Sequence, residues 1–250
     1  MAVEAGGPVA RITLDHPERR NALSHATLSE LLAALTALPD DTEVVVLGAT
    51  GPVFSAGHDL GEMQDRDGAF YDDLFAVCTD VMLAVRALPA PVVARVQGPA
   101  TAAGCQLVAS CDLAVAADTA WFATPGVKVG LFCSTPMVPI TRLVGRRRAL
   151  QMLLTGAPVD AATALDWGLV NAVVPAAGLD VAVDDLVAQI RQWSPRVIAL
   201  GKRAFYDQVD ATEDDAYRTV APVMAANAAA AAAQVGFAAF LGTRPPVWER

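Results

Sequence analysis

Positive charge is scarce in this chain. Its 250 residues include 18 lysines and arginines against 27 aspartates and glutamates, which gives a formal net charge of −9. A polyanion such as a nucleic acid, or an anionic membrane surface, would be repelled on average. We therefore expect no nucleic-acid or membrane partner, and an anionic small ligand would need a local patch of arginines.

Metal-ligand and disulfide patterns are lacking as well. The four cysteines (Cys78, Cys105, Cys111 and Cys133) form no CxxC pair and have no histidine at metal-ligand spacing. We expect reduced, mostly buried thiols, with no metal and no resident cofactor. The chain also lacks a basic-then-apolar leader and an uninterrupted apolar run of about 18 residues. These absences together predict a cytoplasmic protein.

What the chain does have is an alternation of short apolar runs and helical patterns. The runs predict strands at 11–14, 44–47, 92–96 and 112–116, and the intervening spacing predicts helices, including one over 136–154. Only helices are expected after Pro175, the last of them over 212–241. The alternation predicts an α/β fold, with a core of residues 1–194 and a helical appendage of residues 195–250.

One segment is distinguished by its small residues. The run Gly98-Pro-Ala-Thr-Ala-Ala-Gly-Cys-Gln-Leu107 follows the strand at 92–96 and leads into a helix that ends near Ser110. A turn of Gly and Ala lets a ligand approach the backbone, and the free N–H groups of a helix start attract negative charge. The alternative is a tight strand-to-helix connection whose small residues serve packing alone.

A second segment repeats this plan. The strand at 44–47 is followed by a glycine-punctuated run that ends in Ala56-Gly57-His58-Asp59. Two such turns lying side by side can each direct one backbone N–H at a shared point. Upstream, Glu18-Arg-Arg-Asn-Ala-Leu23 places two adjacent arginines in a polar loop, which is either a phosphate site or a solvated loop.

Taken in order, these stretches resemble the crotonase superfamily, the enoyl-CoA hydratase/isomerase fold. The resemblance implies a spiral of ββα units, a C-terminal helical region used in trimer contacts, and a pocket for a CoA thioester. Each motif is weak alone, but the ordered set is a strong signal. The similar motifs are Pro17-Glu-Arg-Arg-Asn-Ala-Leu23, Phe54-Ser-Ala-Gly-His-Asp-Leu60, Pro91-Val-Val-Ala-Arg-Val-Gln-Gly98, Ala103-Gly-Cys-Gln-Leu107, Phe122-Ala-Thr-Pro125 and Val129-Gly-Leu131.

The resemblance also implies roles for single residues. The backbone N–H groups of His58 and Ala103 would form an oxyanion hole for the thioester oxygen, where preformed donors act on developing charge. The residues implied in binding the rest of the acyl-CoA are Arg20 and Ala22 near the nucleotide, Ala56, Asp59, Leu60 and Gly104 near the pantetheine and thioester, and Arg244 at a phosphate.

The chain departs from the family's hydratases at two positions where they carry catalytic glutamates. Gln106 stands at the first position and Gly126 at the second. A glutamine amide can orient a water but cannot take its proton, and a glycine offers no group at all. This variant is similar to one branch of the family, the enoyl-CoA hydratase domain-containing protein 3 type, which shares both losses.

Other side chains near these motifs have open roles. Ser134 either binds a water in the pocket or, with Cys133, packs and caps the following helix. The imidazole of His58 suits proton transfer near pH 7, or else it faces solvent or Asp59. Asp112 is expected to brace the start of a strand.

Three functions therefore remain open. The first is an acyl-CoA enzyme of the hydratase/isomerase family that works through the oxyanion hole with a water or a weak polar group. The second is a non-catalytic acyl-CoA binder, and the third is a thioesterase-like or decarboxylase-like enzyme that relies on the hole itself. In each case we expect a homotrimer or a dimer of trimers.

Overall fold

In the computed structural model, which describes residues 1–249, the main sheet has the strand order β1-β2-β3-β4-β6-β9. The first pair is antiparallel, and all the other neighbours are parallel. The predicted α/β fold is confirmed, as are the strands expected at 44–47 and 92–96. The strands are β1 (Ala2–Glu4), β2 (Val9–Leu14), β3 (Val44–Ala49), β4 (Val92–Val96), β6 (Leu113–Ala117) and β9 (Ala172–Val174).

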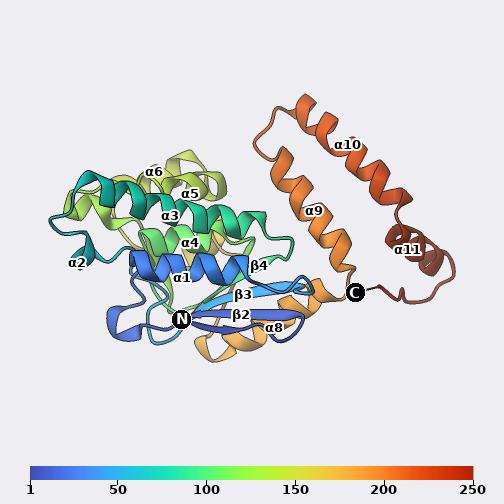
Figure 1. Ribbon diagram of the computed structural model, residues 1–250, viewed down its shortest axis with the longest axis horizontal. Coiled ribbons are helices and arrows are strands. Elements are labelled where there is room, and N and C mark those ends of the chain that lie inside the picture. Colours follow the sequence, from blue (N-terminus) through green and yellow to red (C-terminus); the bar gives the residue numbers. More distant parts are fainter. Residues whose placement is uncertain (250) are drawn as a thin grey trace.

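Helices cover both faces of this sheet. Figure 1 shows α1 (His25–Thr36), α3 (Gly68–Ala87) and α4 (Ala103–Ser110) on one face and α8 (Leu179–Arg191) on the other. Alternating side chains divide between the two layers, since Leu47 packs with the first group of helices and Val46 packs against α8. Every residue of β3 is buried, which explains its uninterrupted apolar sequence.

A small second sheet lies beside α4. It consists of β5 (Ala100–Thr101), β7 (Trp121–Ala123) and β8 (Val159–Asp160), with β5 parallel and β8 antiparallel to β7. Asp160 also caps α7 (Ala161–Trp167), because its carboxylate accepts a hydrogen bond from Thr163 N at 2.7 Å. The pairing of β5 with β7 fixes the chain immediately before α4.

The helix predicted over 136–154 is wrong as a single element. The structure has α5 (Met137–Val144) and α6 (Arg146–Thr155), separated by Gly145 with φ 78°. A left-handed glycine ends one helix and lets the next start in another direction. The remaining short helices are η1 (Pro17–Arg19), α2 (Leu60–Met63), η2 (Pro125–Val129) and η3 (Ala176–Gly178).

The chain ends in three helices that project from the core, which we call the C-terminal arm: α9 (Pro195–Gln208), α10 (Glu213–Ala229) and α11 (Ala231–Leu241). Figure 1 shows α10 running back beside α9 and α11 at the far end. The single helix predicted over 212–241 is wrong, because Ala230 is extended (φ −72°, ψ 152°) and the two helices meet at 64°. No single helix within residues 1–249 is long and apolar enough to cross a bilayer, although α10 and α11 taken together meet that criterion.

A partly buried polar cluster attaches α9 to the core. Lys202 Nζ lies 2.7 Å from Asp112 Oδ2 and donates to the carbonyl oxygens of Val85 and Ala90, each at 3.0 Å. Tyr206 donates to the other oxygen of Asp112 at 2.8 Å. Because Asp112 also accepts from the backbone at the start of β4 (2.6 Å), its predicted bracing role agrees with these contacts.

Candidate functional site

Two loops that follow neighbouring strands of the main sheet run side by side. The backbone of Phe54 donates to Pro99 O at 3.0 Å, and that of Thr101 donates to Ser55 O at 2.9 Å. The hydroxyl of Thr101 donates to Ala56 O at 2.9 Å. These bonds place the turn after β3 directly against the turn after β4, as the repeated plan in the sequence predicted.

Two glycines allow this close approach. A Cβ at Gly57 would lie 2.8 Å from the Cβ of Ala102 and 3.1 Å from Ala103 N, and one at Gly104 would lie 2.7 Å from the Cβ of Ser55. Real Cβ atoms do not come this close, so both positions require glycine. The peptide that carries His58 N–H therefore adjoins the first residues of α4.

The residue before α4 has a strained backbone. Ala102 has φ 49° and ψ −118°, which is unusual for a residue with a side chain. Its N–H donates to Ala123 O at 2.9 Å, so the pairing of β5 with β7 holds it in place. Strain of this kind persists only where the surroundings impose it, and it is concentrated at functional sites. Here it turns the chain so that α4 begins at Ala103, which is buried together with Gly104.

The side chain of His58 faces the protein interior. Its Nδ1 lies 3.2 Å from Leu23 O, and its ring meets Phe75 of α3 edge-on with centroids 5.3 Å apart. Burial lowers the pKa of this imidazole, although the bond to Leu23 and the charge of Glu62 oppose that effect. A ring that faces solvent is therefore wrong, and the acidic neighbour whose charge reaches the ring is Glu62, not Asp59.

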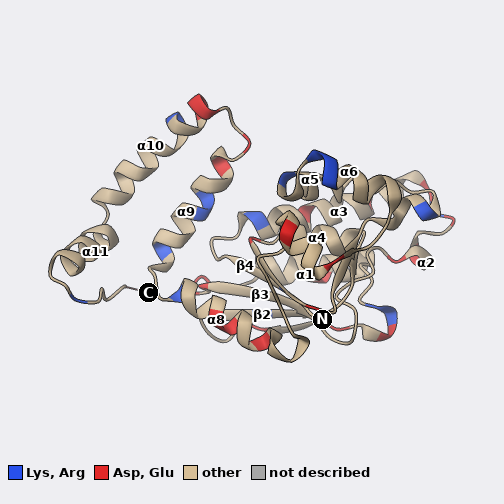
Figure 2. Ribbon diagram, turned by 180° about the vertical axis from the view of Figure 1, so that it is seen from behind, with Lys and Arg blue, Asp and Glu red and all other residues tan. Residues whose placement is uncertain are grey.

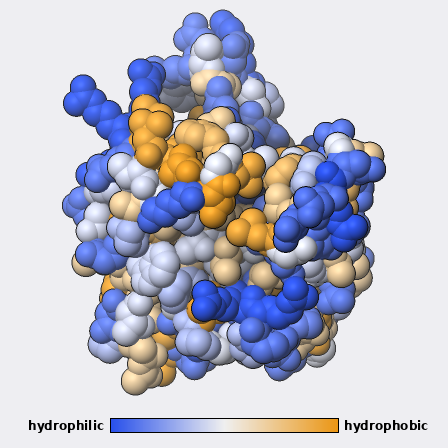
Figure 3. Space-filling view, turned by 90° about the vertical axis from the view of Figure 1, so that its left-hand side faces the viewer, coloured by the Kyte–Doolittle hydropathy of each residue, from blue (hydrophilic) through white to orange (hydrophobic). Residues whose placement is uncertain are grey.

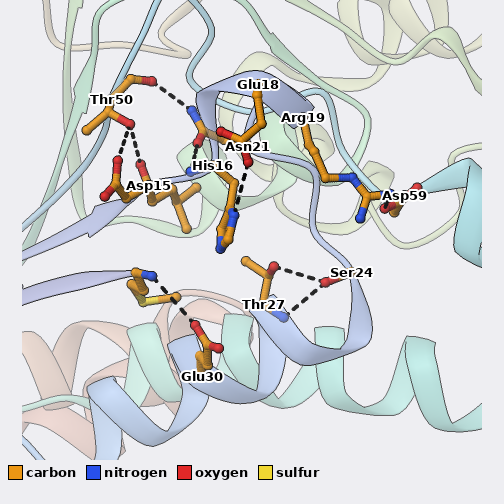
Figure 4. Close-up of polar contacts among 12 residues, drawn as sticks. Asp15, His16, Glu18, Arg19, Asn21, Ser24, Thr27, Glu30, Thr50 and Asp59 are labelled. Atoms are coloured by element: carbon orange, nitrogen blue, oxygen red, sulfur yellow. Dashed lines mark hydrogen bonds and ion pairs between the residues drawn. The ribbon is translucent and has the colours of Figure 1, made fainter.

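Asp59 instead pairs with the arginine loop of residues 17–23. Its carboxylate lies 2.6 Å from Arg19 Nη2 and accepts from Gly61 N at 3.0 Å, which caps α2 (Figure 4). Arg20 is exposed, and no ion pair or hydrogen bond of its guanidinium is recorded within residues 1–249. Of the two arginines, Arg20 is thus the one available to an anion, while the partly buried Ala22 follows it.

The sequence analysis missed the residue that holds this loop. Asn21 is buried, and its amide donates to Thr50 O at 2.9 Å and Val53 O at 2.8 Å (Figure 4). Its side-chain oxygen accepts from His16 N at 2.9 Å. Asn21 has a left-handed backbone (φ 50°), which asparagine tolerates better than most residues. The residue type was the only local sign in the sequence that Asn21 holds this loop.

Gln106 and Gly126, the two positions at which the resemblance implied glutamates, differ in their surroundings. Gln106 is 3% exposed, and its Oε1 is buried with no partner among the described residues. At Gly126, a Cβ would lie 2.9 Å from Cys133 Sγ and closer still to the carbonyl oxygen of Leu131. The loop after η2 therefore occupies the space that any side chain at position 126 would need.

That loop contains the last of the candidate catalytic residues. Ser134 is exposed, and its hydroxyl donates to Phe132 O at 3.3 Å, within its own loop. Cys133 is buried against Gly126, and burial raises the pKa of its thiol. The other three cysteines are buried and unpaired as well, and burial raises the pKa of Cys105 to about 12, so the expectation of buried thiols is confirmed.

The structure does not bring Arg244 to the other candidates. Its N–H bonds to Ala239 O at the end of α11, and α11 lies at the opposite end of the molecule from α2 (Figures 1 and 2). Leu60, by contrast, is the exposed first residue of α2, two residues after His58, and Ala56 lies two residues before His58 in the same turn.

One large cleft lies away from these loops. A cleft of about 740 Å³ lies between α3 and α9, lined by residues such as Leu83, Arg86 and Tyr206, and none of its lining residues belongs to the two loops. Within residues 1–249 no group of three or more His, Cys, Asp or Glu side chains is arranged to hold a metal ion.

Known proteins resemble this chain over nearly its whole length. Mouse enoyl-CoA hydratase domain-containing protein 3, mitochondrial, is 46% identical over 96% of this chain and 81% of the relative. The crystal structure of an enoyl-CoA hydratase from Mycobacterium smegmatis has a TM-score of 0.97 at 46% identity and covers 99% of this chain and 98% of its own. Human enoyl-CoA hydratase domain-containing protein 3 has a TM-score of 0.96 at 44% identity, with 99% of both chains covered.

These comparisons correct one prediction and confirm another. The cytoplasmic location predicted from the sequence is wrong by this comparison, because the mouse relative and its namesakes in other animals are designated mitochondrial. The resemblance to the crotonase superfamily and to the domain-containing protein 3 type is confirmed. The family described as enoyl-CoA hydratase/isomerase matches residues 4–250. With its crotonase fold and a match of this length, the chain belongs to the enoyl-CoA hydratase/isomerase family.

Proposed function

We propose that this protein binds an acyl-CoA thioester with the thioester oxygen between the backbone N–H groups of His58 and Ala103. The observation that carries the proposal is the contact between the two turns, in which Gly57 and Gly104 bring the His58 peptide against the start of α4. Both donors lie in a part of the chain that is largely buried, where backbone dipoles act most strongly on developing negative charge.

Charge around the turns supports a ligand that is anionic at one end. Arg20 is exposed, and its guanidinium has no carboxylate partner among the described residues, unlike Arg19. We place the nucleotide phosphates of the ligand at Arg20 and the thioester at α4. The pantetheine would then pass Ala56, Asp59 and Leu60. Arg244 can contribute only from another copy of the chain, since it follows the distant α11.

In this proposal the site lacks the two proton-transferring groups that a hydratase uses. Gln106 Oε1 can accept a hydrogen bond from a water or a ligand but cannot remove a proton. Position 126 cannot carry a carboxylate while Leu131 and Cys133 occupy the adjoining space. An acid–base group typically contributes about a hundredfold or more to a rate, so efficient hydration is not expected.

A second candidate function is that of a non-catalytic acyl-CoA binder, and it is favoured by the same two positions. The two functions differ in turnover and share the binding step. Thioester cleavage, which needs fewer proton transfers, is the third outcome to be measured with the same ligands.

The test combines binding and turnover with the full chain. Calorimetric titration should show tighter binding of butyryl-CoA than of free CoA, because only the thioester offers an oxygen to the two N–H groups. Equal affinity for both ligands, or none for either, would overturn the proposal.

Turnover of crotonyl-CoA then separates enzyme from binder. We expect Gln106→Glu to hydrate it faster than the wild type by roughly tenfold or more. A wild-type rate within about tenfold of an ordinary hydratase would reject the binder, and release of free thiol from butyryl-CoA would identify a thioesterase.

We also propose that the C-terminal arm packs against further copies of this chain in a trimer or a dimer of trimers. Apolar side chains such as Met224, Phe237 and Phe240 of the arm are 71%, 51% and 85% exposed. An apolar surface of this kind marks an interaction site. The mass in solution, measured by light scattering, tests this directly, and a monomer at micromolar concentration would contradict it.

A further inference from the structure

The imidazole of His58 has a contact that neither the candidate oxyanion hole nor any proton transfer requires. Its Nδ1 lies 3.2 Å from Leu23 O. A carbonyl oxygen can only accept, so Nδ1 must carry the hydrogen and donate it. This bond fixes the tautomer, and in the neutral ring Nε2 is left as the unprotonated nitrogen.

Leu23 also bonds, through its backbone N–H, to the peptide that precedes His58. Leu23 N donates to Gly57 O at 2.8 Å. That carbonyl belongs to the peptide that also carries His58 N–H, and the two groups of a trans peptide point in opposite directions. Because Leu23 holds the carbonyl end of this peptide, the N–H end is turned away from Leu23.

Two hydrogen bonds therefore join Leu23 to the Gly57-His58 segment, one to the carbonyl of Gly57 and one from the ring of His58. The backbone of Leu23 donates to Gly57 O, and the side chain of His58 donates to Leu23 O. Gly57 N is held as well, since it donates to Ser55 Oγ at 3.2 Å. Leu23 and His58 also form an isolated parallel β-bridge. Gly57 O, Gly57 N and Leu23 O thus all have partners, whereas His58 N–H makes no hydrogen bond to a described residue.

We propose that the imidazole of His58 is a positioning group, which orients the backbone N–H of its own residue toward the thioester oxygen by bonding to Leu23 O. This rests on the proposed function, and it adds a role for the side chain of a residue otherwise used through its backbone. The ring does not touch the ligand in this proposal, and it takes no part in proton transfer.

The surroundings of the His58 ring favour the hydrogen bond to Leu23 O only while the imidazole is neutral. Nε2 is buried with no partner among the described residues. The groups that face the ring are the carbonyl of Leu23, the edge of Phe75 on α3 and, at longer range, the carboxylate of Glu62 on α2. A second N–H on the protonated ring would have no acceptor in this position, so protonation favours displacement of the ring.

Three substitutions separate positioning from packing. His58→Asn keeps an N–H donor close to the place of Nδ1, while His58→Ala and His58→Leu remove it. His25→Asn is the matched control, because His25 is a partly exposed histidine whose Nε2 pairs with Asp73 at 2.8 Å. The affinities for butyryl-CoA and free CoA are measured for each protein at pH 5.5 to 8.

We expect His58→Ala and His58→Leu to lose about fivefold to tenfold in affinity for the thioester and little for free CoA, since one orienting hydrogen bond is removed. His58→Asn should retain most of the wild-type preference. Wild-type affinity should fall as the pH drops below 6.5 toward the lowered pKa of His58, whereas His58→Asn should lack this fall and His25→Asn should keep it.

Hydrogen exchange gives a readout that needs no ligand. Amide exchange in the segment 54–60 should speed up in His58→Ala and stay near the wild-type rate in His58→Asn. If the wild type does not prefer the thioester, the proposed function fails. If it does, and His58→Ala keeps that preference, the pH profile and the slow exchange, the positioning role is wrong.

Discussion

At the scale of single residues, the structure shows why position 126 is a glycine. Leu131 N donates to Gly126 O at 2.9 Å, and the carbonyl of Leu131 lies where a side chain at 126 would begin. The glycine is therefore part of the packing of the loop after η2, whereas the resemblance implied only a missing carboxylate.

Replacing this glycine by alanine should destabilise the protein. Gly126→Ala forces the loop at Leu131 and Cys133 to move, and an overpacked site of this kind costs about 1–3 kcal/mol. Urea denaturation followed by circular dichroism measures the change. The control is Gly201→Ala within α9, where a Cβ meets nothing within 4 Å, and which should be neutral or stabilising. Equal stability of the two variants would contradict the steric argument.

Asn21 provides a second test at this scale. Asn21→Ala removes three hydrogen bonds. The partly buried carbonyl of Thr50 loses its side-chain donor, while Val53 O keeps only the bond from Gln97 Nε2 at 3.2 Å. We expect a loss of about 2–4 kcal/mol in the free energy of unfolding. Asn21→Gly, which relieves the left-handed backbone (φ 50°) but restores no bond, should recover only a small part of that loss. Full recovery in the glycine variant would show that strain, and not hydrogen bonding, dominates.

At the scale of elements, α9 is attached to the core through a charged group. The Lys202 ammonium is enclosed by Asp112 and two backbone carbonyls, and burial lowers its pKa although Asp112 opposes that effect. Arg86 adds a bond from its guanidinium to Tyr206 O at 2.6 Å and lies over the ring of the same residue. Lys202 and Tyr206, which lie one turn apart on α9, thus make most of the polar contacts between the arm and the core.

Breaking this cluster on one side should release the arm. Lys202→Met leaves the Asp112 carboxylate partly buried without its cation, which typically costs about 3–5 kcal/mol. We expect faster proteolysis in the arm and a lower melting temperature. The double variant with Asp112→Asn should be less damaged than the sum of the two single changes. Strict additivity would show that the two side chains are not coupled.

The elements that the sequence predicted are those with a local signal. The continuous apolar runs at 44–47 and 92–96 predicted β3 and β4. The second sheet was missed because β5 and β8 are two residues long and exist only through their pairing with β7. The break at Ala230 was missed because an alanine-rich run contains no residue that ends a helix, and the bend depends on how the arm packs.

In the candidate site, too, only the residues with a local sequence signal were predicted. His58, Ala103, Gln106 and Gly126 could be located because they stand in ordered motifs. The contacts of Asn21 and of the His58 ring could not, since their partners lie 29 to 35 residues away in the chain. Such contacts depend on the relative placement of loops that no local pattern encodes.

At the scale of the whole molecule, charge and exposed apolar surface are unevenly distributed. Figure 2 shows basic residues gathered where α5 meets α6, and acidic residues at the start of α10. Figure 3, which faces the side of the molecule where α2 lies, shows an apolar cluster bordered by hydrophilic residues. Leu131, Phe132, Met137 and Val138, in and near the loop after η2, are all 37–50% exposed.

This distribution predicts which surface would form the contact between copies in the proposed oligomer. A double change of the arm, Met224→Glu with Phe237→Glu, should shift the protein from an oligomer to a monomer, because it places charge in an apolar contact. Val181→Glu on α8 is the matched control, since Val181 is 64% exposed but lies under the main sheet, away from the arm. Sedimentation velocity measures both. An arm variant that keeps the wild-type mass would mean that another surface forms the contact.

The double contact of Leu23 couples two parts of the candidate site. Leu23 ends the loop that carries Arg20, and it holds the peptide that carries His58 N–H. Ordering of that loop by a nucleotide therefore also orders the donor for the thioester. Such coupling is reciprocal, so two unlinked fragments, a nucleotide diphosphate and a short acyl-pantetheine, should each raise the protein's affinity for the other. The two halves of a long ligand would thus be recognised cooperatively, through one leucine that neither half touches.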